Sequence, residues 1–155
     1  METVNKIKAL IAAVCGALTA LWGWFGWLVL AWIGMMALDY LTGTAAAFRA
    51  GTWSSKLARD GIWHKTGCVV AVITAGILDL VVGHILEQIA VPLPFTYTVF
   101  LCPLVVVWYL LTEMGSVVEN AGSLGAPIPG WLRRAIEALK DKVDEAGGEE
   151  GEKKI

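Results

Sequence analysis

The chain has 155 residues, of which 57% are hydrophobic and 17% are charged, and its formal net charge is -2. That balance gives no electrostatic reason to bind nucleic acid, and the length suits a single domain. The charges gather at Lys6 and Lys8, in the stretch 49–65 and after Arg133, whereas the runs between them are almost uncharged. This distribution argues against an ordinary soluble domain and predicts an all-α integral membrane protein.

The first apolar segment predicts a short helix over residues 7–22. Residues 9–48 carry a single charge, Asp39, and one helix of that length would measure about 60 Å, roughly twice a bilayer core. Two helices fit better, with a break at the glycine- and tryptophan-rich stretch 23–27. The helix at 7–22 either crosses the membrane or lies in it at a shallow angle. A secretory signal peptide is less favoured, because no small-x-small cleavage site follows and the apolar run continues.

A stripe of small residues runs along this first segment at alternating spacings of four and three. In lipid, small residues let helix backbones approach closely and pack by dispersion. The stripe is either a packing face inside one subunit or a self-association face between copies. Its members are Ala9, Ala13, Gly16, Ala20 and Gly23.

Three further membrane helices are expected at about 27–48, 61–85 and 96–120. A polar and basic loop separates the first two, and a turn with two prolines separates the last two. With four crossings, the basic residues at the N-terminus, in the 49–65 loop and after the last helix all fall on one side, as positive-inside topology requires. We therefore expect a four-helix transmembrane domain over residues 1–122 with both termini in the cytoplasm.

A cytoplasmic segment follows the last crossing. A Gly/Pro linker is expected at 123–130, an amphipathic helix at 131–146 and a disordered charged tail at 147–155. The helix lies either on the inner leaflet or against a partner helix. Its apolar stripe consists of Leu132, Ile136, Leu139 and Val143.

Ionisable side chains inside a bilayer are costly, so each is a functional candidate. Asp39 falls near the midplane, and it and Asp79 are either protonated acids bonded to a neighbouring helix or groups that face a water-filled lumen in an assembly. Lys65 and Glu113 fall nearer the cytoplasmic side, and we expect them to pair, within one chain or between subunits. The full set of pore or packing candidates is Asp39, Gly43, Lys65, Asp79, Glu113, Ser116, Glu119 and Asn120.

The sequence indicates no enzyme, cofactor site or metal site. Cys15, Cys68 and Cys102 all lie in apolar runs and are interpreted as small core hydrophobes rather than as a disulfide frame. His64 and His84 fall near opposite faces of the membrane, so they cannot share a metal. The chain contains neither a P-loop nor a dinucleotide-binding fingerprint.

Several short motifs follow one another in a distinctive order, and a basic amphipathic helix comes after the last. They are Asp39-x-x-x-Gly43, Ser54-Ser55-Lys56, Gly61 with Lys65, Asp79 ending an apolar run, Glu113-x-x-Ser116-Val117-x-Glu119-Asn120 and Leu124-Gly125-x-Pro127-Ile128-Pro129. In this order and spacing, residues 28–145 resemble the toxin-secretion/phage-lysis holins.

The resemblance implies a homo-oligomer in the bacterial cytoplasmic membrane that assembles into a pore or lesion. An endolysin, or a large toxin, would leave the cell through it without stable binding to the holin. No cofactor is implied. Two other functions stay open on the residues alone. One is a small four-helix transporter that uses Asp39 or Glu113 for proton coupling, and the other is a membrane scaffold that transports nothing.

Overall fold

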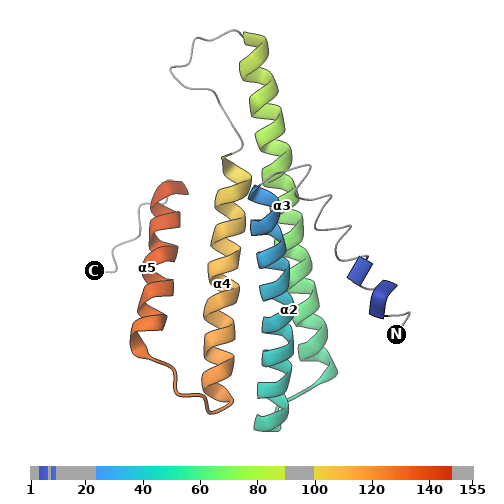
Figure 1. Cartoon of the computed structure of the whole chain (residues 1–155), viewed down its shortest axis with the longest axis vertical. Helices are drawn as coiled ribbons and strands as arrows, with labels where there is room; N and C mark the ends of the chain where they lie inside the picture. Colours follow the sequence, from blue (N-terminus) through green and yellow to red (C-terminus); the bar gives the residue numbers. More distant parts are fainter. Residues whose placement is uncertain (1–3, 7, 10–23, 90–99, 148–155) are drawn as a thin grey trace.

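The computed structural model describes residues 4–6, 8–9, 24–89 and 100–147, and all regular structure in these residues is helical. Four long helices run alternately along the same axis (Figure 1). They are α2 (Trp24–Ala50), α3 (Ser55–Ile89), α4 (Leu101–Ser123) and α5 (Gly130–Gly147).

Three of the described helices are long and apolar enough to cross a membrane, one fewer than the four crossings expected from the sequence. They are Phe25–Ala50, Ser55–Gln88 and Leu101–Ser123. Of the remaining expected helix, at 7–22, only Lys8 and Ala9 are among the described residues, and the rest of its small-residue stripe lies outside them. The fourth crossing, the self-association stripe and the location of the termini therefore stay predictions.

The other helices pack around α4, whose backbone lies close to those of α2, α3 and α5, whereas the backbones of α2 and α3 come close to each other at few positions. The ring of Trp32 on α2 stacks on Tyr109 of α4, with 6.0 Å between the ring centroids. The expectation that Cys68 and Cys102 are core hydrophobes is confirmed, since both are free thiols and buried. The core cluster consists of Trp32, Cys68, Val72, Ala75, Cys102 and Val106.

The connection between α2 and α3 is shorter than the sequence predicts, and the 49–65 region is not a loop. α3 begins six residues before its expected start. The hydroxyl of Ser54 accepts a hydrogen bond from the backbone N–H of Leu57 at 3.1 Å, which is the geometry of a helix N-cap. This cap starts the helix early, so the connection is reduced to 51–54 and most of the basic residues lie on the first turns of α3.

α2 and α4 end in the same glycine cap. Gly51 and Gly125 have φ values of 68° and 91°, and around each the backbone forms the paired hydrogen bonds of a Schellman motif. The two ends are joined, because the Arg49 guanidinium donates to the carbonyl of Leu124. A cation there also suits the negative end of the α4 dipole.

Asp79 of α3 caps the N-terminus of α4. Its carboxylate accepts hydrogen bonds from the backbone N–H groups of Phe100 at 3.2 Å, Leu101 at 3.0 Å and Cys102 at 2.7 Å. The next residue, Pro103, has no N–H to satisfy. One buried side chain therefore satisfies every N–H of the first turn, which a membrane helix otherwise leaves without a partner.

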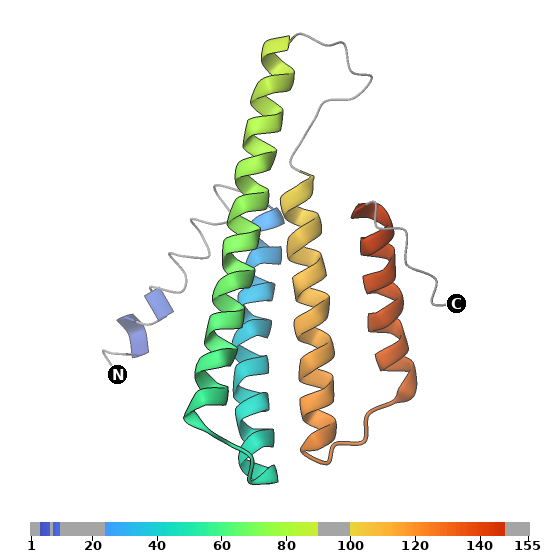
Figure 2. The same cartoon turned by 180° about the vertical axis from the view of Figure 1, so that it is seen from behind.

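α5 runs beside α4 along the bundle (Figure 2). The sequence left two placements for this helix, on the inner leaflet or against another helix, and the structure shows the second within one chain. Of the predicted apolar stripe, Ile136 is buried against α4, whereas Leu139 is exposed.

Removing the Asp79 cap should destabilise the bundle. Asp79→Ala leaves three N–H groups without an acceptor, at about 1–3 kcal/mol each where they are shielded from water. We expect the free energy of unfolding to fall by about 3 kcal/mol, measured by titrating detergent-solubilised protein with denaturing detergent and following tryptophan fluorescence. Asp60→Ala, at an exposed position on the same helix, should change it by less than about 0.5 kcal/mol. Equal losses for the two variants would contradict the cap.

Candidate functional site

Lys65 lies between two acids that come from two other helices. Its Nζ is 2.9 Å from Asp39 Oδ2 of α2 and 2.5 Å from Glu113 Oε2 of α4. The exposed fractions of the lysine, aspartate and glutamate side chains are 15%, 20% and 7%, so the cluster is largely shielded from its surroundings. The predicted pairing of Lys65 with Glu113 is confirmed within a single chain, but the sequence did not predict that Asp39 joins it.

The three charged groups lie at one depth in the bundle. Each is ten or eleven residues from the end of its helix on the side of the α2–α3 connection. At about 1.5 Å per residue this is roughly 15 Å, half the thickness of a bilayer core. The expectation that Lys65 and Glu113 lie nearer the helix ends than Asp39 was wrong, because α3 begins before and α4 ends after the expected residues.

Asn120 of α4 adds an uncharged contact to the same cluster. Its amide nitrogen lies 2.9 Å from Asp39 Oδ1 and 3.2 Å from Thr42 Oγ1. Gly43 makes room for this amide, since a Cβ at position 43 would lie 3.3 Å from the Asn120 nitrogen. The Asp39-x-x-x-Gly43 motif and the asparagine that ends the α4 motif therefore form one contact between α2 and α4.

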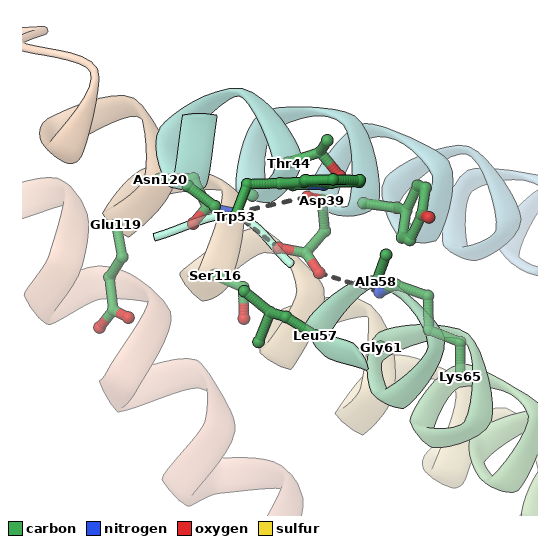
Figure 3. Close-up of a pocket in the computed structure, with 13 residues that line it drawn as sticks. Asp39, Thr44, Trp53, Leu57, Ala58, Gly61, Lys65, Ser116, Glu119 and Asn120 are labelled. Atoms are coloured by element: carbon green, nitrogen blue, oxygen red, sulfur yellow. Dashed lines mark hydrogen bonds and ion pairs between the residues drawn. The ribbon is translucent and has the colours of Figure 1, made fainter. Parts of the chain in front are cut away.

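A cavity of about 320 Å³ opens beside the cluster. It lies between α2 and α3, on the side of the cluster that faces the α2–α3 connection. Figure 3 shows Asp39 and Lys65 at its wall, with Asn120 bonded to the aspartate. Ser116 and Glu119 also line the cavity, but the Glu119 carboxylate points away from Asp39 (Figure 3). Five of the eight candidates are thus connected by contacts, Ser116 and Glu119 line the same cavity without joining them, and Asp79 lies fourteen residues beyond Lys65 on α3.

The cluster joins three helices with one cation and two anions. Where water is excluded, charges persist only when they are paired and hydrogen-bonded, and here each acid comes from a different helix. No group of three His, Cys, Asp or Glu residues that could hold a metal occurs among the described residues. The arrangement therefore suits packing of α2, α3 and α4 more than catalysis.

Comparison with known proteins assigns the family. The sequence pattern of the bacteriophage holin family matches residues 16–141. The chain belongs to the bacteriophage holin family. The match begins within the segment expected as the first helix and ends inside α5, so it includes the whole ion cluster of this holin-family protein.

Similar proteins occur in several bacteria, and all three described here are uncharacterized. A Halalkalibacterium halodurans protein is 31% identical over 140 residues, which cover 90% of this chain and 96% of the relative. A Listeria innocua protein is 30% identical over 99% of this chain and 96% of its own length. A 14.9 kDa Clostridium perfringens protein is 26% identical over 90% of this chain and 96% of its own length. No solved structure matches this holin-family chain.

Sequence reasoning missed two residues that join α4 to α5, Trp108 and Asp144. The indole Nε1 donates to Asp144 Oδ1 at 2.5 Å. A tryptophan in the middle of a membrane helix is a signal that was available, because its N–H seeks an acceptor when buried. The sequence alone does not identify that acceptor, since it lies 36 residues away on the amphipathic helix.

Removing the central cation should cost far more than removing one acid. Lys65→Met leaves Asp39 and Glu113 facing each other, and we expect the free energy of unfolding to fall by about 3–5 kcal/mol. Glu113→Gln keeps the pair of Lys65 with Asp39, whose charges cancel, and should lower the free energy of unfolding by less than about 1 kcal/mol. Both are measured by denaturation in micelles.

Lys56→Met provides the matched control, because this lysine is exposed on the same helix. It should change the free energy of unfolding by less than about 0.5 kcal/mol. A loss for Glu113→Gln as large as that for Lys65→Met would show that Lys65 does not bridge both acids.

Proposed function

We propose that this protein is a holin that assembles with copies of itself in the bacterial cytoplasmic membrane. The assembly is a pore or lesion through which an endolysin, or a large toxin, leaves the cytoplasm. Membership of the bacteriophage holin family supports this proposal. The structural observation that carries it is how little of the apolar helices one chain buries.

Within one chain, only 17%, 17% and 22% of the most apolar stretches of α2, α3 and α4 are buried. On α3 alone, Val70, Ile73, Ile77 and Leu80 are each more than half exposed. Such surface requires lipid or further copies of the chain to cover it. Because so few helices cannot enclose a path for a folded enzyme, the path must lie between copies.

The charges support an orientation for this assembly. The α2–α3 connection and the α4–α5 linker lie at the same end of the bundle (Figure 2). Basic residues cluster there, and positive-inside topology makes that end cytoplasmic. The cluster consists of Arg49, Lys56, Arg59, Arg133 and Arg134.

In this proposal the ion cluster holds the helices of each subunit together. Asp39, Lys65 and Glu113 are paired inside one chain, and Asp79 is bonded to the start of α4. We infer that these residues hold α2, α3 and α4 together before and after assembly. The glycines and alanines that follow Asp39 allow the close approach of α4 that the pairing requires.

One observation favours a second function. The cavity beside Asp39 and Lys65 is large enough for a small solute or several water molecules, and titratable groups next to a cavity are the parts of a proton-coupled transporter. This function differs from the first in the size of what crosses the membrane. A large cytoplasmic enzyme passes a holin lesion but no transporter.

Expression in a bacterium, with and without a cytoplasmic muralytic enzyme that lacks its own export signal, tests the proposal. Together they should cause an abrupt loss of turbidity and release of a large cytoplasmic reporter enzyme. The chain alone should collapse the membrane potential without rapid lysis, and the muralytic enzyme alone should do neither. Continued growth with both would contradict the holin, and uptake of a small solute without release of the reporter would favour the transporter.

A pair of variants at one lipid-facing position sharpens this test. Ile73, in the middle of α3, is 55% exposed. Ile73→Arg places a charge where the proposal expects lipid or another copy, at a cost of about 2.5–3.5 kcal/mol, and should abolish lysis. Ile73→Leu should lyse cells as the unsubstituted chain does. Full activity of the arginine variant would mean that this face meets water.

A further inference from the structure

α5 lies against α4 over nearly the whole length of α4. Near the cytoplasmic end, Ile136 packs beside Gly115, where a Cβ would lie 3.9 Å from the isoleucine Cγ2. At the far end, a Cβ at Gly147 would lie 3.6 Å from Cδ2 of Leu104, three residues into α4. If α4 crosses the bilayer, α5 therefore reaches almost as deep.

Polar contacts fix the far half of α5 in this position. Trp108 donates its N–H to Asp144 at 2.5 Å, and Lys140 Nζ lies 4.3 Å from the centroid of the same indole ring. A hydrogen bond and a cation–π contact on one aromatic ring specify both the depth and the rotation of α5. The apolar stripe alone would specify neither.

The opposite face of α5 carries charges that lipid cannot solvate. The exposed charged residues turned away from α4 are Arg134, Asp141, Lys142 and Glu145, whereas Arg133 and Glu137 line a cavity at the edge of the α4–α5 contact. A charged residue at the centre of a membrane helix is costly, and α5 is not among the candidate membrane spans. A helix placed here thus needs water along its outer face. The outer faces of α2 and α3 differ, because they carry apolar side chains that lipid can cover.

We propose that α5 lines the aqueous lumen of the assembled pore, with its charged outer face toward water and the side that carries Ile136 and Val143 on α4. This inference rests on the proposed holin function and adds to it which surface faces the lumen. In a membrane without a lumen there is no water at this depth. α5 then lies on the cytoplasmic surface, where a helix with one apolar face is stable.

A disulfide between positions 104 and 147 reports the deep placement of α5. The variant carries Leu104→Cys and Gly147→Cys with the native cysteines replaced by alanine, and it is produced with the muralytic enzyme. Membranes are oxidised before and after the onset of lysis, and unreacted thiols are counted by the mass added by a maleimide-polymer. We expect the disulfide yield to rise about tenfold at onset, as the docked population grows.

The matched control pairs Leu104→Cys with Glu145→Cys, which is at nearly the same height but on the exposed face of α5. This pair should stay reduced at both times. Lysis without the 104–147 disulfide would overturn the inference while leaving the holin function intact. Equal yields before and after onset would also overturn it, because α5 would then sit on α4 without a lumen. Absence of lysis by the unsubstituted chain would contradict the proposed function instead.

A second measurement keeps the native cysteines and does not depend on the disulfide variant being active. Trp108→Phe removes the hydrogen bond to Asp144, and Asp144→Ala removes it from the other side. Each should delay the onset of lysis by about fivefold at equal protein level, which is the population change expected for one lost hydrogen bond. Trp63→Phe, at a ring that is 71% exposed, should leave the onset unchanged. Unchanged onset in all three variants would overturn the inference.

Discussion

Hydrocarbon solvates neither a charge nor an unbonded backbone N–H, and the polar contacts of this protein follow from that constraint. Lys65 lies between Asp39 and Glu113, so each charged group in the middle of the bundle has a partner on a neighbouring helix. Asp79 meets the same constraint at the start of α4 by accepting three backbone N–H bonds. Because both arrangements join different helices, the groups that would be most costly alone are the ones that hold the bundle together.

The sequence predicts which residues need partners more reliably than which partners they find. The Lys65–Glu113 pair was predictable, since the two fall at similar depth in adjacent apolar runs. The participation of Asp39 was not, because it depends on the Ser54 cap, which starts α3 early and moves its lysine toward the midplane. The cap formed by Asp79 depends likewise on where α4 begins, and helix ends are the least certain feature of any sequence-based prediction.

The placement of α5 shows a different limit. Its apolar stripe was visible in the sequence, and so was the need for a surface to cover it. The choice between a bilayer surface and α4 depends on Trp108, whose ring receives both Asp144 and Lys140. These contacts join residues more than thirty positions apart on helices with different periodic patterns, so no local pattern encodes them.

Pairing inside the bundle also restricts what can face water in an assembly. Asp39, Lys65 and Glu113 are committed to one another, and turning them toward a lumen would break contacts among three helices at once. Among the described residues that reach membrane depth, the charged face of α5 can face water without breaking the contacts of the ion cluster. In such an assembly, α2, α3 and α4 stay packed together in lipid, while the position of α5 depends on the presence of water. Such an assembly can open without unfolding its subunits, because the helix that moves contacts the bundle through a single face.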